Sequence, residues 1–171
     1  MLPLASGQVV GAQAVLVDDQ DRVLLQLRLW PPGWEPPGGH VGRSEDPAAT
    51  VVREAEEETG LEIEIERLTG YYRFTGLRRD TDVVFRARAV GGRVRRSREA
   101  WRIEWFPADR LPRSLFPWYR QRIADALAPA RLSPPERIQG VGPGEVARHG
   151  LALAVDLLGW ARPGRARPAS P

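Results

Sequence analysis

The segment Gly39 to Leu61 contains a dense cluster of acidic residues enclosed by glycines, and its centre reads REAEEE over residues 53–58. On a helix, Glu54, Glu57 and Glu58 occupy positions i, i+3 and i+4, so their side chains share one face. A different sector of the same helix is apolar or small: Ala48, Val51, Val52, Ala55 and Thr59. The segment is therefore predicted to be a helix that packs one face on a core and presents carboxylates on another.

Both ends of this predicted helix carry boundary signals. Asp46 suits the N-cap, and Pro47 suits the first helical position, where a missing N–H is harmless. Gly60 suits the left-handed position that ends a helix. The preceding run of two prolines and two glycines, residues 36–39, predicts a rigid turn whose glycines let the backbone approach a ligand closely.

The carboxylates on this face repel one another, and each like-charged pair costs a few tenths of a kcal/mol on an isolated helix. A bound cation would offset the repulsion. Because all the ligands would be hard oxygens, the cluster suits Mg²⁺ or Mn²⁺ rather than Zn²⁺. The alternative is an acidic helix face exposed to solvent, since Glu is a good helix former. The glycine loop, Glu45 and Gly60 at fixed spacings favour the metal site.

The same segment resembles the Nudix box, written Gly-x5-Glu-x7-Arg-Glu-U-x-Glu-Glu-x-Gly-U, in which U is a bulky apolar residue. The residues that fall on the motif are Gly39, Glu45, Arg53, Glu54, Glu57, Glu58, Gly60 and Leu61. Ala55 is the weak match, because alanine is apolar but small. Weaker resemblance extends over residues 8–128. The resemblance implies an α/β (α+β) fold, a Nudix-type α/β/α sandwich with two helices flanking a mixed β-sheet.

The resemblance also assigns roles within the box. Glu54, Glu57 and Glu58, with the Gly39 carbonyl, are predicted to hold Mg²⁺ or Mn²⁺. These ions would offset the charge of a pyrophosphate and activate water for attack on phosphorus. Arg53 is predicted to orient the glutamates, since arginine stays protonated and cannot act as the base.

A further glutamate outside the box completes the predicted catalytic set. In many Nudix hydrolases, a glutamate in a loop before a strand ending Trp-Phe binds a metal or acts as the base. Glu99 matches that place, and Glu104 is the competing choice. The predicted catalytic residues are Glu57, Glu54, Glu58, Arg53 and Glu99.

The reaction implied is hydrolysis of a nucleoside diphosphate linked to another moiety X. Arg28 and Arg43 are predicted to contact substrate phosphates, and Trp34 is a candidate for stacking on a base, with packing of its loop as the alternative. Residues 77–79 lack the signatures of members specific for ADP-ribose or for diadenosine polyphosphates, so X stays open. The alternatives are an RNA 5′ pyrophosphohydrolase, which the arginines of residues 93–98 would suit, and a non-catalytic nucleotide-binding regulator.

The chain is predicted to divide into a Nudix domain (1–130), a Pro/Gly linker (131–143), a C-terminal helix (144–160) and a disordered tail (161–171). Residues 8–17 and 22–29 are predicted to form a β-hairpin. The C-terminal helical extension carries much apolar surface and needs burial, either on its own domain or across a homodimer. Dimerisation is the favoured alternative.

Composition limits the other function classes. All 25 cationic side chains are Arg, and the net charge of +3 gives only a weak indication of nucleic-acid binding. The absence of Cys excludes disulfides and allows a reducing compartment. Neither a secretory signal nor a membrane-spanning stretch is recognisable, and the predicted location is cytoplasmic.

Overall fold

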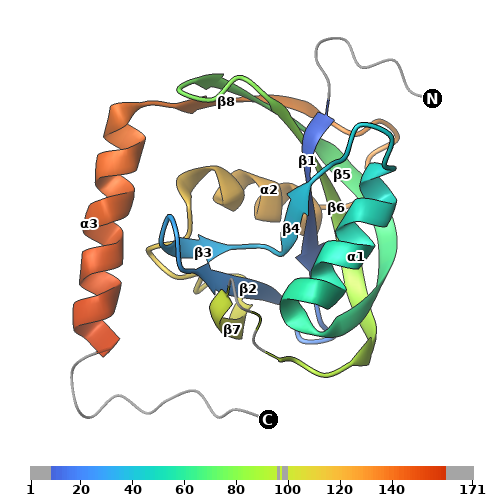
Figure 1. The fold of residues 1–171 in the computed structure, drawn as a ribbon, viewed down its shortest axis with the longest axis horizontal. Helices are drawn as coiled ribbons and strands as arrows, with labels where there is room; N and C mark the ends of the chain where they lie inside the picture. The colour runs from blue at the N-terminus through green and yellow to red at the C-terminus, as the bar shows by residue number, and fades with distance from the viewer. Residues whose placement is uncertain (1–8, 96, 98–99, 161–171) are drawn as a thin grey trace.

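The computed structural model describes residues 9–95, 97 and 100–160 (Figure 1). The strands are β1 (Val9–Leu16), β2 (Arg22–Arg28), β3 (Gly33–Glu35), β4 (Gly38–His40), β5 (Leu61–Gly76), β6 (Thr81–Gly92), β7 (Ala100–Pro107) and β8 (Glu136–Val141). The helices are α1 (Pro47–Thr59), α2 (Pro117–Leu127) and α3 (Pro143–Trp160).

The strands form two sheets. The larger sheet has the order β4-β1-β6-β5-β8, in which β1 runs parallel to β6 and β5 runs parallel to β8, whereas the other pairs are antiparallel. The smaller sheet has the order β3-β2-β7 and is antiparallel. The predicted mixed sheet is confirmed.

Helices α1 and α2 cover opposite faces of the larger sheet (Figure 1). Successive residues of a strand point to opposite faces, and β1 follows this rule. Ala12, Ala14 and Leu16 join the core cluster that contains residues of α1, whereas Val15 joins the cluster that contains Ile123 of α2. This two-sided packing confirms the predicted α/β/α sandwich.

The predicted hairpin of residues 8–17 and 22–29 is wrong in its pairing. A tight turn does connect β1 to β2, with Asp21 at a φ of 55° and an isolated bridge between Val17 and Val23. The two strands then enter different sheets. Because β4 and β6 occupy both edges of β1, β2 pairs instead with β3 and β7.

The C-terminal region contains one strand that the sequence did not indicate. Residues 136–141, which lie in the predicted linker, form β8 and extend the larger sheet by pairing with residues 71–76 of β5. The following helix, α3, is present where a helix was predicted. Within the described part of the chain, none of the helices combines the length and apolar composition of a membrane span. The predicted tail, 161–171, lies outside the described residues.

Candidate active site

Helix α1 carries the predicted carboxylate face, whose glutamates are buried to different extents. The Asp46 side chain accepts a hydrogen bond from the Ala48 N–H at the helix start, and Gly60 ends the helix with a φ of 77°. Because one side of the helix packs on the larger sheet, the three glutamates of this face differ in exposure. The exposed fraction is 60% for the Glu57 side chain, 19% for the Glu54 side chain and 8% for Glu58.

The glycines of β4 lie directly against this face. The Gly38 N–H donates a hydrogen bond of 2.8 Å to Glu58 Oε2. A Cβ atom placed on Gly39 would lie 2.4 Å from the carboxyl carbon of Glu54. The backbone of the glycine loop and two glutamates of the helix therefore share one site, as the box spacing predicts.

Arg53 connects three of the four glutamates of the box. Its guanidinium donates to Glu45 at 3.1 Å, pairs with Glu54 at 2.8 Å and pairs with Glu57 at 3.2 Å. The hydrogen bond from Arg53 and one from the Gly42 N–H lower the pKa of Glu45. These contacts suit the predicted orienting role of Arg53 and place Glu45 as a brace for the loop.

Glu35 on β3 is a residue of this site that the sequence reasoning missed. It is buried, its Oε1 is 3.3 Å from Arg28, and its Oε2 accepts a bond of 3.4 Å from the Tyr119 hydroxyl. Burial raises its pKa to about 7, opposed by Arg28 and Tyr119. The sequence signal was an acid within the apolar and proline-rich run of residues 30–38, but its partners come from distant elements.

Burial also acts on Glu58, whose pKa is raised to about 8. A hydrogen bond from the Gln26 side chain and the Gly38 N–H oppose this rise, whereas the neighbouring charges of Glu35 and Glu54 add to it. Gln26 is the register partner of Glu35 across β2 and β3, so it connects the two buried acids. The inner end of the carboxylate face therefore concentrates carboxyl groups in a region of low exposure, where burial disfavours their ionised form.

The donor chemistry of this face fits Mg²⁺ or Mn²⁺, because the glutamates and the Gly39 carbonyl offer only oxygens. A nearby cation would offset the electrostatic repulsion between Glu58, Glu35 and Glu54. In the described part of the chain, no three acidic or histidine side chains are gathered closely enough to form a ready ligand cluster. Arg53 pairs with Glu54 and Glu57, so these two carboxylates must exchange Arg53 contacts for metal contacts when an ion binds.

The remaining predicted site residues have different surroundings. Arg28 ends β2, is partly exposed and contacts Glu35, and Arg43 is exposed in the loop between β4 and α1. The substrate role of Trp34 is corrected, because its ring has no exposed surface and packs edge-on against Phe106 at 4.8 Å between centroids. Glu99 lies outside the described residues. Its competitor Glu104 lies on β7 and pairs with Arg102.

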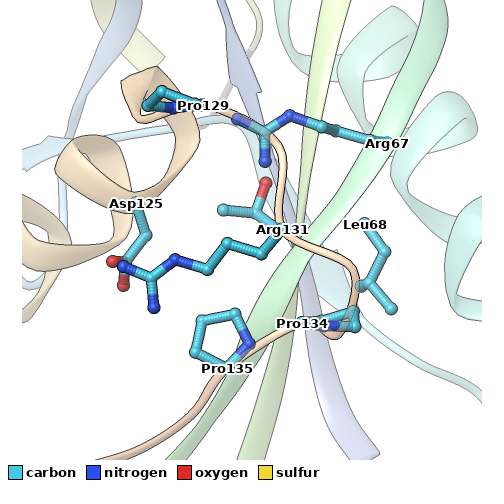
Figure 2. Close-up of a pocket in the computed structure, with 8 residues that line it drawn as sticks. Arg67, Leu68, Asp125, Pro129, Arg131, Pro134 and Pro135 are labelled. Carbon is cyan, nitrogen blue, oxygen red and sulfur yellow. The ribbon is translucent and has the colours of Figure 1, made fainter.

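A separate hollow lies between the C-terminal end of α2, strand β5 and the loop that leads into β8 (Figure 2). Its lining includes Arg67, Asp125, Arg131 and Pro135. Arg67 donates to the carbonyls of residues 126 and 128 and so caps the end of α2. No residue of the Nudix box lines this hollow, and we assign it no part in the reaction.

The two glycines of the loop give a first testable contrast. Gly38→Ala would place Cβ 2.2 Å from the Ala12 carbonyl oxygen at a φ of +154°, so we expect a loss of stability of about 1–3 kcal/mol. Gly39→Ala would meet only the flexible end of Glu54, so we expect a folded protein with roughly 10- to 100-fold weaker metal activation. Thermal unfolding and metal titration of the rate check both results. A larger stability loss in Gly39→Ala than in Gly38→Ala would contradict this geometry.

The sandwich fold and the carboxylate face against a glycine loop define the class of protein: a Nudix-type hydrolase of phosphoric anhydrides. Comparison with known proteins agrees. The NUDIX domain family matches residues 7–126. A MutT-like protein of Streptomyces ambofaciens is 37% identical over 125 residues, which cover 73% of this chain and 79% of that protein.

Two further proteins are similar over a shorter part of the chain. A CMP-5′-(N-acetyl-N-hydroxy-3-aminopropyl)phosphonate hydrolase of Streptomyces rubellomurinus is 37% identical over 110 residues, 58% of this chain and 52% of that protein. The crystal structure of a MutT NUDIX hydrolase from Burkholderia pseudomallei superposes with a TM-score of 0.58 at 30% identity, covering 68% of this chain and 96% of that one. The chain belongs to the Nudix family and is a hydrolase of the pyrophosphatase class, as predicted.

Proposed function

We propose that the chain is a Mg²⁺- or Mn²⁺-dependent pyrophosphohydrolase that cleaves a nucleoside diphosphate linked to another moiety X. The observation that carries the proposal is the contact between the carboxylate face of α1 and the glycine loop. The Gly38 N–H donates a hydrogen bond to Glu58, and the Gly39 backbone lies against the Glu54 carboxyl group. Every charged position of the Nudix box is filled. A non-catalytic regulator on the same fold would have no need of the complete set.

Each residue of the face has a proposed task. Glu54, Glu57 and Glu58 and the Gly39 carbonyl hold the ions, and Arg53 orients Glu45, Glu54 and Glu57 through its ion pairs. A bound divalent ion supplies charge neutralisation for the pyrophosphate and activation of water.

Two residues outside α1 are proposed to contact the substrate, and one to serve catalysis. Arg28 and Arg43 are both exposed, and both are proposed to bind phosphate oxygens. Glu99 stays the proposed further ligand or base, with Glu104 as its competitor.

The proposal names the class of substrate and does not specify the moiety X. One relative is named for CMP linked to a phosphonate and another only as MutT-like, so the names do not agree on one leaving group. The turn between β5 and β6, where several family members carry specificity residues, is occupied by Arg78 paired with Asp80 at 2.7 Å. At the opposite end of β6, Arg93 and Arg95 follow the strand beside the end of α1 and are exposed, and they favour RNA 5′ pyrophosphohydrolysis as the second candidate.

A substrate panel tests the proposal. It contains nucleoside di- and triphosphates, ADP-ribose, nucleotide sugars, CMP-linked phosphonates, dinucleoside polyphosphates and 5′-triphosphate RNA, each with Mg²⁺ or Mn²⁺. Metal-dependent phosphate release from a small nucleotide supports the first candidate. Release from RNA alone, with binding that weakens steeply as salt rises, supports the second. Nucleotide binding without turnover in the whole panel would instead indicate a regulator.

The predicted homodimer also stays a proposal, and α3 supplies its surface. The residues of α3 that face away from the domain include Leu151, Val155 and Leu158, with Leu151 70% and Leu158 69% exposed. Their spacing places them on one stripe. A second copy would cover the same stripe by two-fold symmetry, the commonest arrangement of soluble oligomers.

Replacing Leu151 and Leu158 together by glutamine is expected to convert a dimer to a monomer, because it removes the apolar area that association would bury. Light scattering after size exclusion, over a range of concentrations, measures the mass. Arg148→Gln is the matched control, since Arg148 is exposed on the same helix but carries no apolar surface of this stripe. A wild-type chain that is already monomeric at the highest concentration would refute the dimer. The cytoplasmic location stays a prediction.

A further inference from the structure

Helix α3 is attached to the domain through two polar side chains on its inner face. His149 Nε2 lies 2.8 Å from the Pro32 carbonyl oxygen, and because a carbonyl only accepts, the imidazole donates. The same ring stacks on Phe116 at 4.2 Å between centroids and 18° between planes. Asp156 Oδ2 accepts the backbone N–H and the hydroxyl of Ser114 at 2.8 and 2.5 Å. These contacts are directional and fix the helix at two points.

The fit of α3 on the domain depends on a glycine. A Cβ atom on Gly33 would lie 2.6 Å from His149 Nε2 and 2.8 Å from the Phe116 ring. Only a residue without a side chain lets the imidazole reach the backbone here. The close approach indicates a specific contact and not a loosely placed terminal helix.

The two contacted segments are hydrogen-bonded to each other. The Trp34 N–H donates to the Ser114 carbonyl at 2.9 Å, and the Phe116 N–H donates to the Trp34 carbonyl at 3.1 Å. Residues 114–116 thus act as a second neighbour of the short strand β3, on the side opposite β2. His149 binds the residue just before β3, and Asp156 binds the first residue of the neighbouring segment.

Strand β3 leads from these contacts into the candidate active site. It ends at Glu35, which is bonded to Arg28 and Tyr119. Glu35 faces Gln26 in the β2–β3 register, and the Gln26 side chain hydrogen-bonds Glu58. A shift of β3 therefore moves the groups that hold Glu58, the buried glutamate of the carboxylate face.

The helix contributes little to the domain core. Within the described residues, neither hydrophobic core cluster includes a residue of α3, and the inward residues of the helix are only partly buried. The helix also lies beyond residues 7–126, the segment that matches the family. Its inner face is thus poorly explained by core formation and well explained by the placement of β3.

We propose that α3 is a positioning element of the active site, in which His149 and Asp156 fix β3 and residues 114–116 and thereby hold Glu35 and Gln26 in place beside Glu58. His149 and Asp156 are positioning residues, since they reach the reaction only through other groups. The kinetic part of this inference rests on the proposed function, whereas its structural part does not.

The test compares the wild-type full-length chain with the His149→Phe/Asp156→Ala double variant. Phenylalanine keeps the stack on Phe116 but cannot donate to Pro32, and alanine removes the acceptor for Ser114. We expect faster hydrogen exchange in peptides covering residues 30–36 and 112–117, weaker Mn²⁺ binding by calorimetry and a kcat lower by roughly 10- to 100-fold. The melting temperature is expected to change by only a few degrees, since the core clusters are intact.

Two further variants separate positioning from general stability. The single variant Asp156→Asn keeps an acceptor oxygen for Ser114 and is expected to retain most of the exchange protection and turnover of the wild type. The single variant Asp156→Ala has no acceptor and is expected to lose both. Arg148→Ala changes an exposed residue of the same helix and is expected to behave as wild type.

Each outcome decides the inference. Unchanged exchange and unchanged Mn²⁺ binding in the double variant would overturn it, as would activity losses that only follow the unfolded fraction. If the wild type hydrolyses nothing in the panel, the proposed function fails, but the comparison of exchange and Mn²⁺ binding still decides the role of α3. Wild-type turnover with a double variant that turns over equally fast would overturn the inference and leave the function intact.

Discussion

Glu57→Gln is expected to lower kcat by roughly 100-fold or more while leaving the fold intact. Glutamine has the same shape as glutamate but lacks the charge that a divalent ion requires. The side chain is 60% exposed and contacts Arg53, so the substitution leaves no buried group unpaired. Metal-dependent phosphate release on the best substrate of the panel measures the loss, and thermal unfolding verifies the fold.

Glu56→Gln is the matched control for this experiment. It is the same chemical change one residue earlier on α1, on an exposed position outside the predicted carboxylate face. We expect its turnover to equal that of the wild type. Equal turnover in Glu57→Gln and the wild type would remove Glu57 from the site, and equal losses in both variants would point to the charge of the helix as a whole.

The metal-free protein is expected to lose stability as the pH rises from about 5 to 8. Burial raises the pKa of Glu35 to about 7 and of Glu58 to about 8, from an ordinary value of 4.5. Between these values the folded chain keeps protons that the unfolded chain has released. Folding therefore takes up protons, and the free energy of unfolding falls with rising pH, by on the order of 3 kcal/mol for each of the two groups. Urea unfolding at pH 5.5, 7 and 8.5 in the presence of a chelator measures it.

Mg²⁺ and Glu58→Gln provide the controls for the pH experiment. Mg²⁺ at pH 8.5 is expected to restore stability, by about 2.7 kcal/mol at 100 times its Kd, because it binds the ionised face of the folded state. Glu58→Gln is expected to flatten the pH dependence, since it removes one of the two buried titrating groups, whereas Glu56→Gln keeps the wild-type slope. A wild type and a Glu58→Gln variant that decline in parallel would show that Glu58 does not titrate in this range.

The two experiments together describe a conflict between stability and function at the carboxylate face. A buried glutamate destabilises the metal-free fold when it is ionised, yet only the ionised form can bind a cation. Activity is thus expected to require the protonation state that the empty site disfavours. Glu58 is the residue of the carboxylate face on which this conflict falls.

Much of this site was predictable because its signals are local. The start of α1 at Asp46, its end at Gly60 and the shared face of Glu54, Glu57 and Glu58 follow from capping chemistry and from the period of the helix. The Nudix pattern added the link to Gly39, whose backbone lies against Glu54 in the structure.

Other features depended on contacts between residues far apart in the chain. Trp34 was open to two readings from the sequence, and only its packing against Phe106 decided that it belongs to the core. Strand β1 does not pair with β2, because β4 and β6 already occupy both of its edges. Strand β8 forms by pairing with the edge of β5 that β6 leaves free. A local pattern carries no information about such partners, since any extended segment with the right period suits several edges.

By itself, the sequence determined the family, the helix that carries the glutamates and the chemistry of its acidic face. The tertiary structure decided which of those glutamates is buried, and it brought Glu35 and Gln26 beside Glu58 from two strands of the second sheet. It also decided that α3 contacts β3. The physical reason is that capping and periodicity act within a few residues, whereas burial and the resulting pKa shifts depend on every element that packs around a side chain.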